Sequence, residues 1–238
     1  MKVNFGETVP LSTLDWPGKA TITVFLRGCP FRCLYCQNHE LLASEEIIDL
    51  EEVESKILET ERYIDGVVVS GGDPLQQPEV TKELGMFSRE NELGFGLHTN
   101  GYYPHHLKEL IDQDLLDFTS IDIKAPLDEE EKYQRICGKK IDVDRIKKSL
   151  NILKKSEIEL EITTTFFDYE LNKSDLEKIK NSIKDEKFVV QQGRTENAYK
   201  EEIKKIDSIE KNSLIDLAKK IDYSNIYVRT KQEGEEKV

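Results

Sequence analysis

Short apolar runs alternate along this chain with segments of helical apolar spacing. Short runs that favour strands lie at 20–26, 66–70, 95–99, 118–123, 158–165, 188–191 and 226–229, and the Val run at 66–70 shows no alternation, as is typical of a parallel strand covered on both faces. Helical spacing predicts helices at 50–60, 78–91, 104–113, 142–155, 173–184 and 209–220. Strand and helix therefore alternate roughly six times, which predicts right-handed βαβ units and a parallel sheet.

This alternation predicts an α/β fold built as a partial (β/α)6 barrel, because the repeats are too few for a closed eight-fold barrel. We expect a single domain over 1–230. Its lead-in over 1–19 ends in the breaker Pro17-Gly18, its barrel core spans 20–194, and a C-terminal extension spans 195–230. The charged tail 231–238 has few apolar anchors, and we expect it to be disordered.

Composition and charge narrow the class of protein. The 238 residues are 37% hydrophobic and 34% charged, with a formal net charge of −13, which argues against broad electrostatic binding to nucleic acid or anionic lipid. No apolar run has the length of a membrane span, and the N-terminus has no signal-peptide hydrophobic region. We therefore expect a cytoplasmic protein without a membrane partner, in a compartment where thiols stay reduced.

Three of the four cysteines lie within eight residues, directly after the first predicted barrel strand. Cys29, Cys33 and Cys36 share one loop, with three and then two residues between them. Three close thiolates without a clear fourth favour a four-iron cluster with one iron open over a structural zinc site, which takes four ligands. The alternatives are a disulfide and a zinc knuckle completed by His39 or Cys137. Cys137 is otherwise a small, partly buried residue.

Polar motifs follow four other predicted strands. They are Ser70–Pro74, His98–Gly101, Ser120–Pro126 and Gln191–Arg194. Because active sites of such folds lie at the carboxyl ends of the strands, these motifs are expected to meet the cysteine loop. Each also has a plainer interpretation on its own: two turns, a structural salt bridge and a surface turn, respectively.

Local chemistry supports ligand binding at these motifs. The paired glycines Gly71 and Gly72 let backbone approach a ligand closely. In a strand, Asp122 and Lys124 point to the same face, so they can pair or share a ligand. An acid and a base that face the barrel mouth need such a partner, because unpaired burial is costly.

The chain resembles the radical S-adenosylmethionine enzymes. The cysteine spacing, with aromatic Tyr35 directly before the third cysteine, is the hallmark of that family. The resemblance implies a [4Fe-4S] cluster on Cys29, Cys33 and Cys36, whose open iron binds the methionine end of S-adenosyl-L-methionine. Reduction then cleaves the sulfonium and yields a 5′-deoxyadenosyl radical. The cofactors carry this chemistry, and the protein positions them.

The same resemblance implies the residues that contact the cofactor. They are Tyr35, Gly71, Gly72, Asp73, Thr99, Asn100, Asp122 and Lys124, and Gln192 is a further candidate because a Gln at the end of its strand could reach the adenosine end of the cofactor. Three positions depart from the family pattern. Asp73 replaces the usual Glu, a change that a backbone contact would survive, and Thr163 stands where related activases often have Arg. His98 replaces an Asp that helps to hold a monovalent cation in some activases, and we expect a packed histidine there.

The lead-in Ser12-Thr-Leu-Asp15-Trp-Pro-Gly18 is similar to that of the branch that activates anaerobic ribonucleoside triphosphate reductase. The resemblance therefore implies an activase that abstracts hydrogen from a glycine of this partner, with a flavodoxin or ferredoxin as electron donor. A pyruvate formate-lyase-type activase remains an alternative. So does a radical enzyme acting on a small molecule, like 7-carboxy-7-deazaguanine synthase. A non-enzymatic zinc-binding module is the third alternative.

Overall fold

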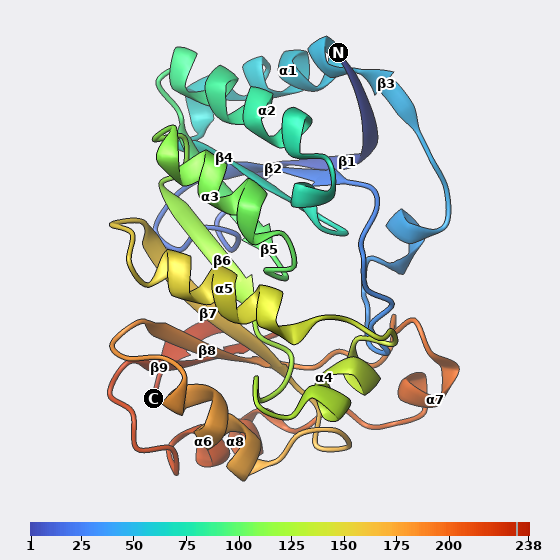
Figure 1. Ribbon diagram of the computed structural model, residues 1–238, viewed down its shortest axis with the longest axis vertical. Helices are drawn as coiled ribbons and strands as arrows, with labels where there is room; N and C mark the ends of the chain where they lie inside the picture. Colours follow the sequence, from blue (N-terminus) through green and yellow to red (C-terminus); the bar gives the residue numbers. More distant parts are fainter. Residues whose placement is uncertain (232) are drawn as a thin grey trace.

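The computed structural model describes residues 1–231 and 233–238, and these form one open ten-stranded sheet (Figure 1). Its strands are β1 (Lys2–Ser12), β2 (Thr21–Leu26), β3 (Ile47–Asp49), β4 (Gly66–Gly71), β5 (Gly94–Thr99), β6 (Phe118–Asp122), β7 (Glu159–Phe166), β8 (Lys187–Gln192), β9 (Ile226–Thr230) and β10 (Gly234–Lys237). The order is β10-β9-β8-β7-β6-β5-β4-β2-β1-β3. Because β10 and β3 do not pair, the barrel is unclosed, as the sequence predicts.

The seven strands from β2 to β9, without β3, run parallel, and antiparallel strands cover both edges. Helices connect them: α1 (Leu50–Leu58), α2 (Pro78–Glu90), α3 (Pro104–Asp112), α4 (Glu130–Ile136), α5 (Val143–Leu153), α6 (Lys173–Asn181), α7 (Glu201–Lys204) and α8 (Lys211–Ala218). Three short 3-10 helices lie at His39–Leu42, Glu61–Tyr63 and Pro74–Gln76. No helix of the described residues combines the length and apolarity that crossing a membrane requires.

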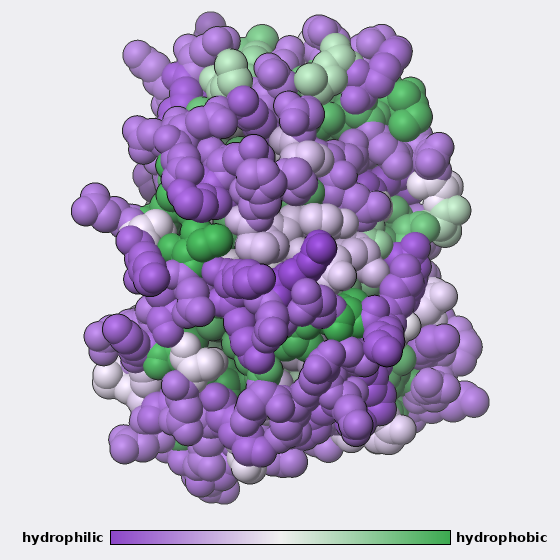
Figure 2. All heavy atoms as spheres, viewed as in Figure 1, coloured by the Kyte–Doolittle hydropathy of each residue, from purple (hydrophilic) through white to green (hydrophobic). Residues whose placement is uncertain are grey.

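The two faces of the sheet have different packing. Apolar side chains of alternate strand positions, such as Phe95 and Leu97, pack under the helices in one large core. On the opposite face, Trp16 stacks on Phe118 with ring centroids 5.1 Å apart and donates from Nε1 to Glu159 Oε2 at 3.0 Å. The lead-in therefore fills the barrel at the amino ends of the strands, and Trp16 is a packing residue. Mostly hydrophilic side chains cover the face seen in Figure 2.

Two terminal segments differ from the sequence expectation. Residues 2–12 form β1, a strand that the sequence did not predict because Gly6 and Pro10 interrupt its apolar pattern. The tail 231–238, expected to be disordered, contains β10, while residue 232 lies outside the described residues. Ladder hydrogen bonds to β9 hold this strand, and Glu235 of β10 binds Arg229 at 2.5 Å. Pairing with β9 thus orders a segment that has almost no apolar anchors of its own.

Candidate functional site

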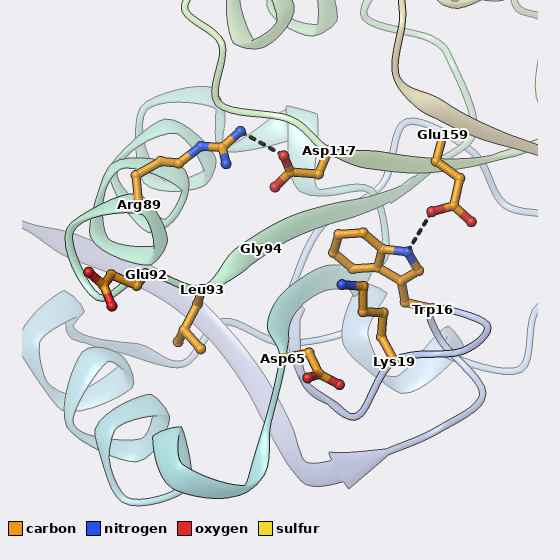
Figure 3. A pocket seen from close by; sticks show the side chains of 9 residues that line it. All are labelled: Trp16, Lys19, Asp65, Arg89, Glu92, Leu93, Gly94, Asp117 and Glu159. Atoms are coloured by element: carbon orange, nitrogen blue, oxygen red, sulfur yellow. Dashed lines mark hydrogen bonds and ion pairs between the residues drawn. The ribbon is translucent and has the colours of Figure 1, made fainter.

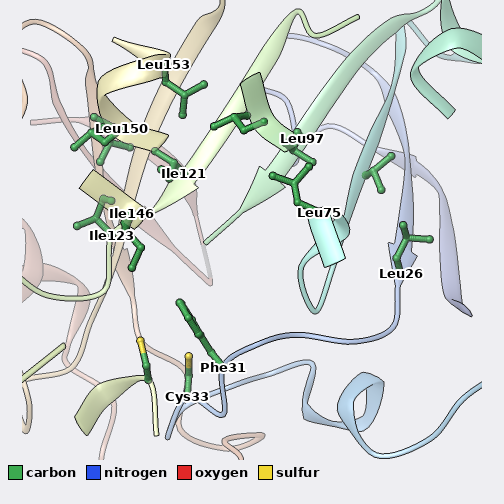
Figure 4. Packing of buried hydrophobic residues seen from close by; sticks show 14 of the residues in the cluster. Leu26, Phe31, Cys33, Leu75, Leu97, Ile121, Ile123, Ile146, Leu150 and Leu153 are labelled. Carbon is green, nitrogen blue, oxygen red and sulfur yellow. The ribbon is translucent and has the colours of Figure 1, made fainter. Parts of the chain in front are cut away.

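The three cysteines lie on the loop that leaves the carboxyl end of β2. Gly28 opens this loop with φ +97°, a conformation that side chains other than glycine rarely adopt. Cys33 is buried, and Cys29 and Cys36 are half-buried; all four cysteines of the chain are free thiols. Phe31 anchors the loop: its ring is 1% exposed and lies below Leu75 and Leu97 in the core (Figure 4).

The segment after α4 supports the cysteine loop from behind. The loop amides of Arg32 and Leu34 donate to the carbonyls of Cys137 at 2.8 Å and Ile136 at 3.2 Å. Gly138 completes the contact, because a Cβ there would lie 2.1 Å from the Arg32 carbonyl oxygen. The neighbouring Cys137 thiol lowers the pKa of Cys33. Sequence reasoning offered Cys137 as a fourth zinc ligand or as a small, partly buried residue, and its distance along the chain gave no signal of this contact.

The pKa values of the other two thiols, Cys29 and Cys36, are raised, so both hold their protons more tightly than usual. Burial raises the pKa of Cys29, and burial likewise raises the pKa of Cys36 to about 11, while the Lys124 ammonium acts in the opposite direction on both. Buried thiols that prefer to stay neutral become good ligands once a cation binds, because a coordinating thiol is deprotonated outright. Loading metal on this loop therefore releases protons.

The paired glycines at the end of β4 lie directly against the cysteine loop. The Gly72 amide donates to the Leu26 carbonyl at 3.0 Å, and the Asp73 amide donates to the Gly28 carbonyl at 2.8 Å. A Cβ on Gly71 would come within 2.1 Å of the Leu26 oxygen, and one on Gly72 within 2.0 Å of the Gly28 oxygen. Only glycine therefore permits this approach of the two strand ends.

Asp73 connects the ends of β4 and β5. Its carboxylate is fully buried; one oxygen accepts from the Leu75 amide at 3.0 Å, and the other accepts from Thr99 Oγ1 at 2.9 Å and the Asn100 amide at 2.8 Å. Burial raises the pKa of Asp73 to about 6 in spite of these bonds. With three donors bound to its two oxygens, Asp73 holds the two loops together, and its contact with a cofactor stays a prediction.

Asn100 extends this connection to the cysteines. Its Nδ2 donates to Cys29 Sγ at 3.5 Å, and its Oδ1 accepts from the Tyr102 amide at 3.0 Å. Thr99 Oγ1 meanwhile accepts from the Gly101 amide at 3.1 Å. The structure thus brings the cysteine loop, the glycine pair and the Thr-Asn-Gly turn into one continuous group, as the strand-end argument predicted.

The acid and base after β6 complete the group. Lys124 Nζ binds Asp122 Oδ2 at 2.5 Å and lies 5.5 Å from the centre of the Tyr35 ring. Burial pushes the pKa of Lys124 down, but Asp122 and the neighbouring thiols outweigh it and hold the pKa well above its usual value. The Asp122 Oδ1 atom and the Tyr35 hydroxyl are buried, and neither has a hydrogen-bond partner among the described residues.

These features fit a cluster and a polar cofactor. The fit rests on three free thiols on one loop, a glycine pair with no room for side chains, and two orphaned polar atoms beside a charged lysine. Unpaired buried polar atoms are costly, so a polar ligand would stabilise the site. No three His, Cys, Asp or Glu side chains of the described residues converge on a single ion. The knuckle candidate His39 packs instead beside Tyr199, with ring centroids 5.8 Å apart.

Gln192, a candidate cofactor contact, and His98, a departure from the family pattern, both lie outside this group. Gln192 Nε2 donates to the Ile209 carbonyl at 2.8 Å, and its Oε1 accepts from the Lys231 amide, so backbone groups of the C-terminal segments engage both ends of its amide. The candidate cofactor contact at Gln192 therefore has no support in the geometry. His98 binds the Asp15 carbonyl through Nε2 at 2.7 Å, which makes it the packed histidine that we expected.

A guanidinium does lie beside Thr163, but it comes from the far end of the chain. Buried Glu161 accepts from Thr163 Oγ1 at 3.2 Å and from Arg229 Nη2 of β9 at 2.8 Å. Lys187 binds the same carboxylate at 3.0 Å, and Glu235 pairs with both cations. Sequence reasoning missed this four-charge cluster, because its members come from four different strands.

A pocket of ≈ 520 Å³ lies at the amino ends of the strands, away from the cysteines (Figure 3). Its lining includes Trp16, Arg89, Asp117 and Glu159. Arg89 pairs with Asp117 at 2.8 Å, and Glu159 accepts from Trp16, so these four polar side chains are already engaged within the protein. Strand-end logic and the orphaned atoms both favour the opposite end as the functional site.

Comparisons with known proteins agree with the site. The family model "Radical SAM superfamily" matches residues 23–183. A candidate glycyl-radical enzyme activating enzyme of Methanocaldococcus jannaschii is 32% identical over 97% of this chain and 97% of its own length. The pyruvate formate-lyase-activating enzyme of Clostridium pasteurianum is 31% identical over 73% of each chain. A radical SAM methyltransferase structure from Sphaerobacter thermophilus shares the fold, with TM-score 0.67, 14% identity and coverage of 94% and 69%.

Proposed function

The chain belongs to the radical SAM superfamily, and on this premise we propose that it activates a glycyl-radical enzyme by taking a hydrogen atom from a glycine of that partner. Its cofactors are a [4Fe-4S] cluster and S-adenosylmethionine. The observation that carries the proposal is the match over 97% of both chains with an activating enzyme, since every site motif falls within it. The pyruvate formate-lyase-activating enzyme is a second relative of the same activity class.

The chain's own residues hold, orient and insulate the cofactors. Cys29, Cys33 and Cys36 are the cluster ligands in this proposal. The bound pair supplies a carbon radical that abstracts hydrogen. Lys124 offers a cation to a carboxylate, and the free Asp122 oxygen accepts from an ammonium or a hydroxyl. Tyr35 covers the site from the loop side, where its ring stacks on Phe167 at 4.7 Å and excludes water.

We further propose anaerobic ribonucleoside triphosphate reductase as the partner. The lead-in 12–18 supports this choice, because it is similar to that of the activases of this reductase. Pyruvate formate-lyase is the alternative partner that the relatives favour. A flavodoxin or ferredoxin would reduce the cluster. We place the reaction in the cytoplasm, because four free thiols suit a reducing compartment.

The test begins with anaerobic reconstitution of iron and sulfide. We expect a brown protein that forms 5′-deoxyadenosine and methionine from S-adenosylmethionine with dithionite, and a Cys33→Ala variant that forms neither. Each candidate partner is then added separately, and electron paramagnetic resonance is used to look for a glycyl radical. A radical on the reductase alone supports our choice, and one on the lyase alone replaces it. Stoichiometric zinc without cofactor cleavage would refute the enzyme proposal itself.

A further inference from the structure

The loop that carries the three cysteines is closed at its base by hydrogen bonds. It leaves the end of β2 and returns to the same place in the 3-10 helix His39–Leu42. There the Gly28 amide donates to the Leu41 carbonyl at 3.1 Å, and Arg27 Nη1 donates to the Glu40 carbonyl at 3.2 Å. The two ends of the loop therefore meet, and the positions of Arg27 and Gly28 decide how the chain enters the loop.

Gln77 binds this base from the segment between β4 and α2, where it is the N-cap residue of α2. Its Oε1 accepts from the Asn4 amide at 2.9 Å, and its Nε2 donates to the Asn4 carbonyl at 2.9 Å and to the Arg27 carbonyl at 3.0 Å. A side-chain amide has two N–H groups to donate, so both are used here. The side chain of Gln77 thus pairs with Asn4 as the backbone of a neighbouring strand would, and it also reaches the end of β2.

These contacts hold Arg27 at both its backbone amide and its carbonyl. The Arg27 amide donates to the Asn4 carbonyl at 3.0 Å, while Gln77 donates to the Arg27 carbonyl. The next carbonyl, that of Gly28, accepts from the Asp73 amide at 2.8 Å. One short segment after β4 therefore fixes two consecutive carbonyl groups directly before the first cysteine.

The close packing at this point requires an accurate chain position. A Cβ on Gly72 would lie 2.0 Å from the Gly28 carbonyl oxygen, so the two backbones have almost no space between them. A shift of the chain at Gly28 would move Cys29, whose sulfur accepts from Asn100 Nδ2 at 3.5 Å. The hydrogen bonds of Gln77 oppose this shift.

We propose that Gln77 is a positioning residue for the iron–sulfur cluster: by holding the Arg27 carbonyl, it fixes the point at which Cys29 enters the site. Its hydrogen bonds go to backbone groups of the loop base and of β1, so it acts on the cluster through the loop. Removing a group that orients metal ligands typically lowers metal affinity by about 10–100-fold. The inference rests on the cluster of the proposed function, and it does not depend on which partner is activated.

The experiment compares the reconstituted Gln77→Met variant with the unmodified protein, because methionine has nearly the same length but cannot make these hydrogen bonds. Release of iron to a chelator, followed by the visible absorbance of the cluster, should be about tenfold faster or more in the variant. Electron paramagnetic resonance of the reduced cluster with S-adenosylmethionine should show altered g values, because the first ligand is displaced. The matched control is Gln76→Met. It removes the amide of the adjacent, exposed glutamine and breaks no side-chain hydrogen bond of the part of the chain that the structure describes.

The two measurements together separate positioning from a purely structural role. Faster iron release with unaltered g values would show only a looser fold, and iron release at the unmodified rate would show no role at all. Either result overturns the proposal. If Gln77→Met does not fold, Gln77→Glu replaces it, because glutamate keeps an acceptor for the Asn4 amide and lacks the donor to the Arg27 carbonyl. Gln76→Glu is then the charge-matched control, and the same two changes are expected.

Cluster formation distinguishes this proposal from the proposed function. If the unmodified protein forms a cluster but does not cleave S-adenosylmethionine with dithionite, the proposed function fails, and the comparison of iron release still tests Gln77. If the unmodified protein forms no cluster, both fail. If it forms a cluster and cleaves S-adenosylmethionine, and Gln77→Met releases iron no faster, the positioning proposal alone is overturned.

Discussion

Asn100 donates a hydrogen bond from its side-chain Nδ2 to the sulfur of Cys29 at 3.5 Å. The two residues are 71 positions apart, and the carboxyl ends of β2 and β5 bring them together. Hydrogen bonds to ligand sulfurs are one of the ways in which a protein sets the reduction potential of its cluster. We therefore propose a role for Asn100 toward the cluster in addition to its predicted contact with S-adenosylmethionine.

Asn100→Ala should shift the potential of the cluster to more negative values. The donor stabilises the extra negative charge of the reduced cluster, and a lost hydrogen bond of about 1 kcal/mol corresponds to roughly 40 mV for one electron. A redox titration followed by electron paramagnetic resonance measures the shift. Asn181→Ala, at an exposed position in α6, serves as the control and should leave the potential unchanged. Equal potentials in both variants would exclude an electronic role for Asn100.

Asp73→Asn should destabilise the cluster-free protein by about 1–3 kcal/mol. The carboxylate accepts three hydrogen bonds, two of them on one oxygen, and either orientation of an amide would turn an NH₂ group toward a buried donor. Urea unfolding, followed by the fluorescence of Trp16, the single tryptophan, gives the free energy. Asp207→Asn, which changes an exposed aspartate, is expected to cost almost nothing. Equal unfolding midpoints for the two variants would show that Asp73 does not hold the loops.

The positions of the motifs at the strand ends correctly predicted several contacts within the site. Asp122 and Lys124 pair as the alternation predicted, although β6 ends at Asp122. Gly71 and Gly72 meet the cysteine loop because parallel strands end at one edge. Gln192 has contacts that such reasoning did not predict. The side-chain amide of Gln192 hydrogen-bonds to backbone groups of segments that follow β8, and no local sequence pattern predicts where these later segments will lie.

The C-terminal end shows a second limit of sequence reasoning. Residues 231–238 have the composition of a disordered tail, yet β10 pairs with β9 and delivers Glu235 to Arg229 and Lys187. The stabilising partners come from strands that are distant in sequence, so charge-rich composition alone gave the wrong expectation. The branched network around Glu161 has the same origin, since its cations arrive from β8 and β9.

Gly72→Ala should prevent assembly of the site while leaving most of the barrel folded. The added methyl would lie 2.0 Å from the Gly28 carbonyl oxygen, and both residues lie within two positions of the paired ends of β4 and β2, which limits how far either can move. We expect the cysteine loop to move and binding of S-adenosylmethionine to be lost, as measured by calorimetry on the reconstituted protein. Gly18→Ala meets no atom within 4 Å, and should cost only the strain of its φ of +82°. Normal cofactor binding by Gly72→Ala would mean that the close approach is unnecessary.

Glu161→Gln tests the charged cluster through its pH dependence. Burial raises the pKa of Glu161, but Arg229 and Lys187 outweigh it and hold the pKa below the usual 4.5. Such a group stabilises the fold above about pH 4.5, and this contribution is lost as pH falls through the lower folded-state pKa. Removing one partner of a buried pair costs about 3–5 kcal/mol, and Glu235 still binds both cations, so we expect about 3 kcal/mol at pH 7.

The difference in unfolding free energy between the unmodified protein and Glu161→Gln should therefore be largest at neutral pH and shrink toward pH 3. Urea unfolding at a series of pH values measures it, and taking the difference removes the contribution of titrating groups that do not interact with Glu161. Glu157→Gln, an exposed change four residues earlier, should show no such pH-dependent difference. A constant difference from pH 7 to pH 3 would mean that Glu161 is not held ionised by its cations. The destabilisation would then come from altered packing, and the charge cluster would not be what orders the C-terminal strand.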